Sequence, residues 1–255
     1  MSAVYPDLEN LPVLITGAAS GIGASLTAHF ARQKVKLGLI DINEAGLAQI
    51  AADATRDGAS AVATLKIDLR DVAALRKGIA DLAGKLGAFR VLINNAGDDA
   101  RLAADKVEPE YWDDRMAVNL RHQFFAAQAV APGMQEAGGG SIVNLGSISW
   151  MFGAPGLIAY TTAKSAVMGM TKSLAREFGP MGIRVNSIAP GMIWTEKQTA
   201  RAQADDPAKL ARYLERQCIK EPLEPADVSR LALWLASAEA RRASGQTYVI
   251  DGGVV

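Results

Sequence analysis

The sequence predicts a single-domain α/β fold with a seven-stranded parallel sheet and helices on both faces. Short aliphatic or β-branched segments alternate with longer segments in which apolar residues recur every three or four positions, the pattern of successive β-α-β units. Residues 91–93 are apolar throughout, as a strand covered on both faces requires. No linker, repeat or low-complexity tract divides the 255 residues, so we expect one domain.

The individual elements follow from this alternation. The predicted strands are residues 13–16, 36–41, 63–68, 91–94, 141–147, 184–189 and 247–250. The predicted helices are residues 22–32, 44–54, 71–86, 113–136, 160–177 and 225–236. Residues 190–225 contain no predicted strand and carry one short helix near residues 207–216. Because loops of this length are usually functional, we expect them to form a lid over a ligand site.

Composition and charge exclude several classes of protein. The chain has 27 basic and 27 acidic residues, so it offers no net charge to nucleic acid or to an anionic membrane. Its single cysteine, Cys218, cannot form an intrachain disulfide, and the two histidines, His29 and His122, lack the spacing of a metal site. Asp7 and Glu9 stand where an export signal would be basic, and no segment reaches the ~18 apolar residues of a membrane span. We therefore expect a soluble, cytoplasmic protein without a metal, in which both histidines occupy packing or surface positions.

A glycine-rich turn follows the first predicted strand and begins the first helix. Gly17, Gly21 and Gly23 are spaced there by four and two residues. Glycine permits a tight turn and lets backbone N–H groups and the helix N-terminus approach a pyrophosphate. This context predicts the dinucleotide site of a Rossmann fold, formed by Gly17, Ser20, Gly21, Ile22 and Gly23, rather than a turn that only needs glycine.

Asp41 ends the second predicted strand and bears on the choice of cofactor. An acidic side chain at this place accepts hydrogen bonds from the ribose hydroxyls of an adenosine. A 2′-phosphate would meet like charge, and the glycine turn has no Arg or Lys to compensate. NAD is therefore favoured over NADP. The alternative role for Asp41 is to cap the helix that follows.

Three polar residues in the second half of the chain can meet at one place. Tyr160 and Lys164 stand four residues apart in a predicted helix, so their side chains share one face. Ser147 ends the preceding strand, and open α/β sheets bind ligands outside the carboxyl ends of their strands. The pKa of tyrosine is near 10 in water, and a nearby ammonium favours the phenolate. We therefore predict that Lys164 lowers the pKa of Tyr160 and makes it a base, although the pair alone is also common on protein surfaces.

Over almost its whole length the chain resembles the short-chain dehydrogenase/reductase family. The motifs are the glycine turn, Asp68-Leu69, Asn94-Asn95-Ala96-Gly97, Asn119, Ser147, Tyr160, Lys164, Pro190-Gly191, Thr195 and Asp251-Gly252-Gly253. The resemblance implies that Ser147 holds the reacting oxygen and that Tyr160 exchanges its proton. It implies that Lys164 binds the nicotinamide ribose while lowering the tyrosine pKa, and that Asn119 holds a water in the proton path. It also implies a homotetramer and further cofactor contacts from Asp68, Leu69, Asn95, Ala96, Gly97, Pro190, Gly191, Ile193 and Thr195.

A narrower resemblance is to the bacterial aldose 1-dehydrogenases of this family, of the D-xylose type. It rests on residues 95–101, 119–122, 131–134 and 146–150. It implies oxidation of a pentose-like sugar, such as D-xylose or L-arabinose, at the anomeric carbon to the aldonolactone. Asp98, Asp99, Ser149 and Trp150 flank the predicted site beside Ser147 and Tyr160, and they suit a sugar because they offer polar groups and an indole face. The alternative is that the acidic pair caps the next segment and Trp150 packs under the lid.

Other functions stay open at this point. One is a dehydrogenase of a 2-keto-3-deoxy sugar acid or another secondary alcohol, whose substrate carboxylate would need Arg101 or Lys197. Another is a catalytically silent NAD-binding sensor or scaffold, which is disfavoured because all four residues that the resemblance makes catalytic, Asn119, Ser147, Tyr160 and Lys164, are present. A 3-oxoacyl-carrier-protein reductase is less favoured, because the resemblance implies NADP for such enzymes whereas Asp41 favours NAD.

Overall fold

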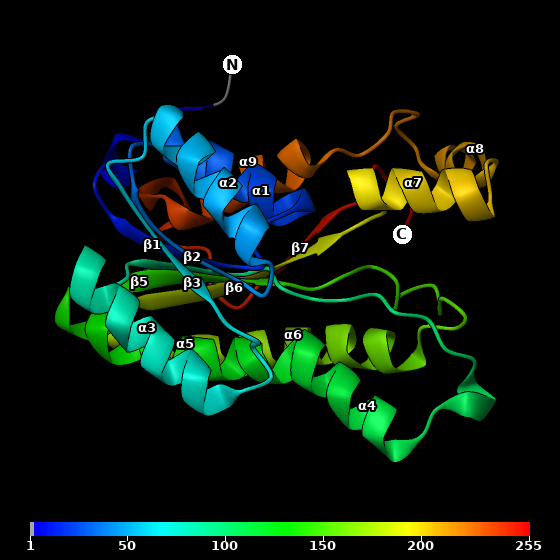
Figure 1. Cartoon of the computed structure of the whole chain (residues 1–255), viewed down its shortest axis with the longest axis horizontal. Helices are drawn as coiled ribbons and strands as arrows, with labels where there is room; N and C mark the ends of the chain where they lie inside the picture. The colour runs from blue at the N-terminus through cyan, green and yellow to red at the C-terminus, as the bar shows by residue number, and fades with distance from the viewer. Residues whose placement is uncertain (1–2) are drawn as a thin grey trace.

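The computed structural model describes residues 3–255 and confirms one α/β domain with a single seven-stranded sheet (Figure 1). The strands are β1 (Pro12–Thr16), β2 (Lys36–Asp41), β3 (Ala61–Lys66), β4 (Val91–Asn94), β5 (Gly140–Leu145), β6 (Ile183–Pro190) and β7 (Thr247–Ile250). Every neighbouring pair is parallel, and the order is β3-β2-β1-β4-β5-β6-β7. The strand order reverses between β1 and β4, so the crevice at their carboxyl ends is the expected ligand site.

Helices cover both faces of the sheet (Figure 1). One face carries α1 (Gly21–Ala31), α2 (Glu44–Arg56) and α9 (Pro225–Ala236), and the other carries α3 (Val72–Leu86), α5 (His122–Glu136) and α6 (Ile158–Phe178). Shorter helices are α4 (Pro109–Met116), α7 (Glu196–Asp205) and α8 (Lys209–Arg216). None of the helices within residues 3–255 combines the length and the hydropathy needed to cross a membrane.

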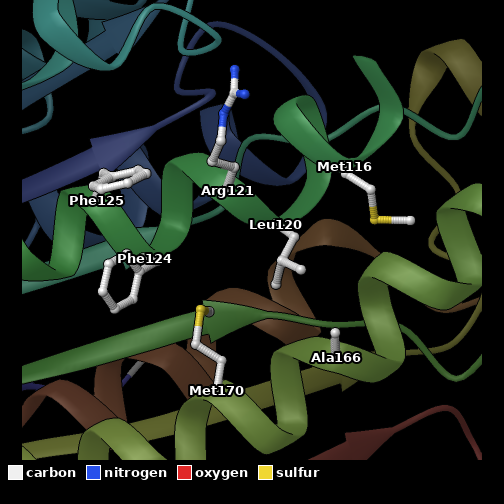
Figure 2. A pocket seen from close by; sticks show the side chains of 7 residues that line it. All are labelled: Met116, Leu120, Arg121, Phe124, Phe125, Ala166 and Met170. Atoms are coloured by element: carbon white, nitrogen blue, oxygen red, sulfur yellow. The ribbon is translucent and has the colours of Figure 1, made fainter. Parts of the chain in front are cut away.

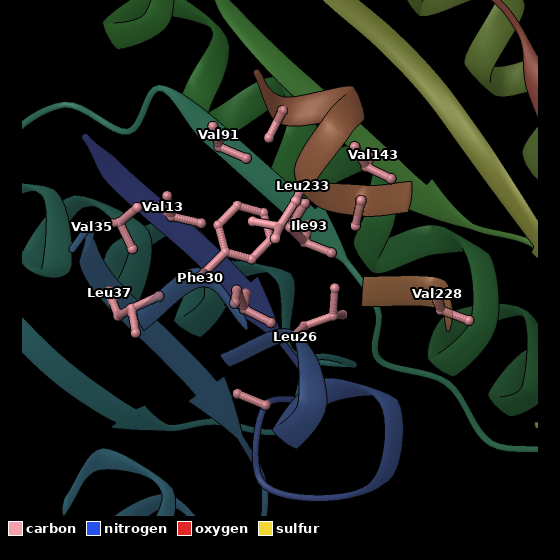
Figure 3. Close-up of a cluster of buried hydrophobic side chains, with 14 of the residues drawn as sticks. Val13, Leu26, Phe30, Val35, Leu37, Val91, Ile93, Val143, Val228 and Leu233 are labelled. Atoms are coloured by element: carbon pink, nitrogen blue, oxygen red, sulfur yellow. The ribbon is translucent and has the colours of Figure 1, made fainter. Parts of the chain in front are cut away.

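The sheet separates two apolar cores because alternate residues of a strand point to opposite faces. Val13 and Ile15 of β1 lie in the first core together with Phe30 of α1, and Figure 3 shows the Phe30 ring close to Val13. Leu14 lies in the second core with Leu92 of β4. All five side chains are fully buried. Burial on both faces explains why the central strands are apolar at successive positions.

Two predicted strands extend too far toward their carboxyl ends. β3 runs over Ala61–Lys66 instead of residues 63–68, because its only neighbour, β2, ends at Asp41 opposite Lys66. Asp68 therefore lies in the loop after the strand. The pairing of β5 with β6 ends at Leu145, so Ser147 stands two residues beyond β5 and not within it.

The helix predicted over residues 113–136 consists of three parts. α4 begins earlier, at Pro109, where the missing N–H of proline is tolerated in the first turn. A five-residue π turn, Ala117–Arg121, then joins α4 to α5. Apolar periodicity does not distinguish such a turn from an α-helix, which is why the prediction missed it. π turns concentrate at functional sites, and this one contains Asn119.

The predicted lid, residues 190–225, contains two helices instead of one. α8 agrees with the short helix expected near residues 207–216, whereas α7 was not predicted because its sequence is mostly polar and lacks an apolar stripe. A bridge between Ile193 and Leu223 joins the two ends of the segment. In the view of Figure 1, α7 and α8 appear on the same side of the molecule as the C-terminus.

Candidate active site

The glycine turn is held so tightly that side chains would not fit. Gly17 has a φ of +65°, and a Cβ atom there would lie 2.7 Å from the Cα of Ala96. A Cβ on Gly23 would lie 1.8 Å from the carbonyl oxygen of Gly17. Asn95 fixes the turn from β4, because its Nδ2 donates to the carbonyls of Thr16 and Gly17 at 3.0 and 2.9 Å. The turn therefore requires glycine at these positions for packing, whatever binds there.

The remaining residues of the turn lie at the entrance of the crevice. Ser20 is exposed at the N-cap position of α1, and Ile22 is half-buried against the first core. A Cβ on Gly21 would meet the Cγ2 of Thr195 at 3.1 Å, so the start of the lid lies directly over the turn. Thr195 itself caps α7 by accepting a hydrogen bond from the Gln198 N–H. The structure thus places Thr195 against the glycine turn, and its predicted contact with the cofactor stays a prediction.

Asp41 is bound to the glycine turn and does not cap the following helix. Its Oδ2 accepts from the N–H of Ala19 at 2.9 Å, and its Oδ1 accepts from the N–H of Asn43 at 2.9 Å. The cap of α2 is Asn43, whose side chain accepts from Gly46. The carboxylate stays half-buried at the end of β2, beside the turn. The alternative reading of Asp41 as a helix cap is therefore wrong.

Asp68 is engaged in a chain of ion pairs along the edge of the crevice. Its carboxylate accepts from Arg70, which lowers the pKa of Asp68, and Arg70 also pairs with Asp114 at 2.6 Å. Arg115 joins Asp114 to Asp98. The chain thus links the end of β3 to the loop after β4. Leu69, the neighbour of Asp68, is buried in the second core.

Ser147 and Tyr160 lie together beyond the carboxyl end of β5. The Ser147 hydroxyl donates to the Ser149 hydroxyl at 2.9 Å and accepts from the Ser149 N–H at 3.1 Å. The phenol of Tyr160, near the start of α6, lies within hydrogen-bonding reach of the Ser147 hydroxyl. Ser149 is thus buried directly beneath Ser147, and Trp150, next in the chain, is half-buried.

Lys164 is buried one turn after Tyr160. Its Nζ donates to the carbonyl of Leu145 at 2.8 Å and lies 5.7 Å from the centroid of the Tyr160 ring. Burial lowers the pKa of Lys164 to about 8. Burial also raises the pKa of Tyr160 to about 12, and the charges of Asp99 and Asp98 add to this, while the hydrogen bond from Ser147 opposes it. The predicted lowering of the Tyr160 pKa is therefore not seen, because the ammonium is turned toward a carbonyl and burial has the larger effect.

Asn119 uses its side chain to hold the backbone of the loop after β4. Its Oδ1 accepts from the Asp98 N–H at 2.9 Å, and its Nδ2 donates to the carbonyls of Asp98 and Arg115 at 3.1 Å each. A Cβ on Gly97 would meet Asn119 at 3.0 Å and the Nζ of Lys164 at 3.2 Å. Asn119 and Lys164 thus flank Gly97. The side chain of Asn119 is thus fully engaged, and its main-chain carbonyl accepts from the Nε2 of Gln123 at 3.4 Å.

Helix α7, in the predicted lid, is fastened to the loop after β4 by the two aspartates that were expected to flank the substrate site. The carboxylate of Asp99 accepts from Gln198 and Arg201 of α7, both at 3.0 Å, and Asp98 pairs with Lys197 at 3.7 Å. Burial raises the pKa of Asp99, but the hydrogen bond from Gln198 and the nearby positive charges outweigh it and lower the pKa overall. Asp99 is therefore an ionised anchor for α7, while its predicted contact with a sugar stays a prediction.

The end of β6 leads into residues 190–225, the predicted lid. Pro190 is buried as the last residue of β6, and the N–H of Gly191 donates to Ile250 of β7 at 2.9 Å. Ile193 is buried at the bridge with Leu223. These residues place Thr195 at the crevice. On the other side of the lid, the guanidinium of Arg216 in α8 lies over the ring of Phe152.

His122 and Gln123, next to the π turn, were not predicted as site residues. His122 is fully buried, and burial together with the charge of Lys164 lowers its pKa to about 3. Gln123 is also fully buried and donates to the carbonyls of Asn119 and Leu145. The signal in the sequence was their position three and four residues after Asn119. Within residues 3–255 no cluster of His, Cys, Asp and Glu is arranged to hold a metal.

This geometry defines a class of protein: a Rossmann fold whose glycine turn and Ser-Tyr-Lys group meet at one crevice. The chain matches the family model described as enoyl-(acyl carrier protein) reductase over residues 17–255. It belongs to the short-chain dehydrogenase/reductase family, whose members use a nicotinamide cofactor.

Similar proteins of known name agree with this assignment. The chain is 46% identical to the probable galactose dehydrogenase GalD of Rhizobium meliloti over 254 residues, covering 99% of this chain and 98% of that one. It is 42% identical to D-xylose 1-dehydrogenase of Caulobacter vibrioides over 252 residues, with 99% and 98% covered. The crystal structure of a putative short-chain alcohol dehydrogenase from Sinorhizobium meliloti superimposes with a TM-score of 0.92 at 33% identity, with 97% of each chain covered.

Proposed function

We propose that the protein is an NAD-dependent sugar dehydrogenase that oxidises an aldose, such as D-xylose or L-arabinose, at the anomeric carbon to the aldonolactone. The observation that carries this proposal is the meeting of Ser147, Tyr160 and Lys164 beside the glycine turn. Similarity over the full chain to a galactose dehydrogenase and a D-xylose 1-dehydrogenase supports a sugar as the substrate.

The crevice fits a dinucleotide for a physical reason. The turn carries no side chains at Gly17, Gly21 and Gly23 and leads directly into the N-terminus of α1, whose first N–H groups point out of the helix and suit a pyrophosphate. We assign the pyrophosphate to this turn and the adenosine ribose to Asp41. The residues proposed to hold the cofactor are Gly17, Ser20, Gly21, Ile22, Gly23, Asp41, Asp68, Leu69, Asn95, Ala96, Gly97, Tyr160, Lys164, Pro190, Gly191, Ile193 and Thr195.

The protein's own groups then have distinct tasks. The nicotinamide, when bound, supplies the acceptor for the hydride that leaves the sugar. Ser147 orients the C1 hydroxyl, and Tyr160 as phenolate takes its proton. Lys164 binds the nicotinamide ribose and stabilises the phenolate, which burial alone disfavours. The carbonyl of Asn119 holds the water that passes the proton on.

The choice of NAD over NADP rests on Asp41. Its carboxylate accepts from the turn at Ala19, so a negative charge is fixed where a 2′-phosphate would lie. Asp41→Asn keeps an oxygen acceptor for Ala19 but removes the charge. We expect the ratio of kcat/KM with NAD to kcat/KM with NADP to be about tenfold smaller in this variant than in the parent. A variant that rejects NADP as strongly as the parent would refute the argument.

Charge at the lid favours a neutral sugar over a sugar acid. An acidic substrate needs a free cation, but Lys197 pairs with Asp98 and Arg201 pairs with Asp99. Arg101 is exposed, and its guanidinium reaches the carbonyl of Pro155 only at 3.4 Å. A carboxylate would therefore have to compete with two aspartates for the lid cations. Dehydrogenation of a sugar acid or another secondary alcohol is the second candidate, with Arg101 as its recognition residue.

We further propose that the protein assembles as a homo-oligomer through the surface formed by α5 and α6. Figure 2 shows an apolar groove there, lined by Met116, Leu120, Arg121, Phe124, Phe125, Ala166 and Met170. Phe124 leaves 38% of its surface exposed. A second copy offers the same apolar face, so two copies can bury both. Light scattering of Phe124→Asp should give a smaller particle than the parent, whereas Ile219→Asp, an exposed apolar site outside the groove, should leave the mass unchanged.

The experiment that tests the proposed activity is a panel of aldoses with each cofactor. D-xylose, L-arabinose, D-galactose and L-fucose are incubated with NAD or NADP, and the reduced cofactor and the lactone are measured. We expect lactone and NADH in equal amounts with at least one aldose. Oxidation of sugar acids or simple secondary alcohols without any aldose would replace the proposal by the second candidate. Cofactor binding without turnover of any compound would favour the silent sensor or scaffold.

A further inference from the structure

The side chain of Gln123 lies where it can influence the positions of both Asn119 and Lys164, the two residues that flank Gly97. Its Nε2 donates to the carbonyl of Asn119 at 3.4 Å and to the carbonyl of Leu145 at 3.3 Å. The same Leu145 carbonyl accepts the ammonium of Lys164 at 2.8 Å. One amide group thus connects the π turn, the end of β5 and the lysine of α6.

The polar side chain of Gln123 is costly where it stands. It is fully buried, and its Oε1 finds no hydrogen-bond partner within residues 3–255. A buried amide with an unpaired oxygen lowers the stability of a fold relative to an apolar side chain of similar shape. Packing alone therefore does not explain why the chain carries glutamine here.

The main-chain carbonyl of Gln123 is hydrogen-bonded to the sheet, which fixes the point from which the Gln123 side chain extends. The Nδ2 of Asn94, the last residue of β4, donates to the carbonyl of Gln123 at 3.0 Å and to the Oδ1 of Asn144 at 2.9 Å. Asn144 in turn donates to Thr171 of α6 at 3.1 Å. All of these side chains are fully buried. Gln123 therefore extends from a rigid polar network toward Lys164.

We propose that Gln123 is a positioning residue that fixes the Leu145 carbonyl, and through it the ammonium of Lys164, at the distance from Tyr160 that the reaction needs. This role rests on the function proposed above. The same side-chain amide binds the Asn119 carbonyl, so it also fixes the position of the π turn relative to Lys164.

The pH dependence of the reaction should report this positioning. The titratable groups that face the Tyr160–Lys164 pair are Asp98 and Asp99 from the loop after β4 and His122 from α5. Replacing Gln123 removes none of these titratable groups. If Lys164 moves away by about 1 Å, its field at the phenolate weakens, and the acid limb of kcat moves to higher pH by about 0.3 unit.

The test is Gln123→Met, with Gln128→Met as the matched control. Gln128 lies on the exposed side of the same helix, where it binds Arg76. For Gln123→Met we expect kcat to fall about tenfold, with the KM of the sugar and the Kd of NADH changed less than about twofold. The control should keep the parent values. Parent values of kcat and of the acid limb in Gln123→Met would overturn the proposal, even if its Tm changed.

A second variant and a second readout keep the test independent of folding and of the proposed substrate. Gln123→Asn retains a buried amide, but its shorter side chain reaches the carbonyls of Asn119 and Leu145 less well. It therefore replaces Gln123→Met in the test if that variant fails to fold. Titration of the Lys164 ammonium itself, followed by NMR of its side chain with Lys164→Met as the blank, reports its surroundings without any substrate, because Lys164 titrates near pH 8. We expect a lower pKa of Lys164 in either Gln123 variant, even if no aldose is oxidised, because a displaced Leu145 carbonyl accepts less well from the ammonium. An unchanged titration would overturn the role of Gln123 while leaving the proposed activity untouched.

Discussion

Lys164 is the residue whose charge should set the pH range of the reaction. Its Nζ lies 5.7 Å from the centroid of the Tyr160 ring. At an effective dielectric constant of about 20, unit charges at this distance interact by about 3 kcal/mol, which equals about two pKa units. Lys164→Met removes the charge but keeps an unbranched side chain. Tyr160 should therefore need about two pH units more to become a phenolate.

The sign of the effect depends on pH. Burial lowers the pKa of Lys164 to about 8, so the ammonium is present below that pH and is lost above it. The parent should exceed Lys164→Met in kcat by about 100-fold near neutral pH, and the ratio should shrink as the pH rises through 8. The assay is kcat at saturating cofactor and sugar across pH 6 to 10, followed by NADH absorbance.

The control is Lys172→Met, the same change at an exposed position two turns further along α6. It should leave kcat unchanged at every pH. A ratio between parent and Lys164→Met that stayed constant from pH 6 to 10 would show that Lys164 acts through position or cofactor binding alone. The electrostatic reasoning would then be refuted.

Three further changes test other parts of the structure. The pKa of His122 is about 3 in the folded protein and near 6.5 in the unfolded chain, so its contribution to the free energy of unfolding is fully present above pH 6.5 and is lost as the pH falls. Urea titrations should therefore show that the free energy of unfolding decreases by about 2 kcal/mol between pH 7 and pH 5. His122→Gln should not show this decrease. Gly23→Ala should weaken NADH binding by at least about tenfold, because the new Cβ would lie 1.8 Å from a carbonyl oxygen. The control, Gly84→Ala, has open space around its new Cβ, so it should bind NADH normally, and its free energy of unfolding should rise by about 0.5–1 kcal/mol. Asp99→Asn should weaken the attachment of α7, because it removes the charge that binds Arg201. We expect faster amide hydrogen exchange in α7 and a several-fold higher KM for the sugar. Unchanged exchange in α7 would contradict the role of Asp99 as an anchor.

Short-range sequence patterns predicted the parts of the site that depend on local geometry. The spacing of Tyr160 and Lys164 on one helix face and the position of Gly17, Gly21 and Gly23 after a strand are such patterns. Each needs only a regular strand or helix to bring its residues together. The fold followed for the same reason, because strands buried on both faces carry near-continuous apolar segments.

The features that were missed depend on contacts between distant segments. α7 has little apolar periodicity and gains contacts through Gln198 and Arg201, which bind Asp99 about one hundred positions earlier in the chain. The role of Asp99 as an anchor was hidden for the same reason. The pKa of Tyr160 was predicted with the wrong sign, because burial depends on packing of the whole domain and not on the neighbouring ammonium.

Tyr160→Phe gives the most direct test of the central claim, that the Tyr160 phenol removes the proton of the substrate hydroxyl. The variant keeps the ring and its packing but removes the hydroxyl. The same substitution at Tyr248, whose ring packs edge-on against Trp234, is the control. We predict that Tyr160→Phe lowers kcat by about 10²–10⁴-fold at every pH while NADH binds as in the parent, and that Tyr248→Phe keeps its activity. Turnover by Tyr160→Phe at the parent rate would contradict the account.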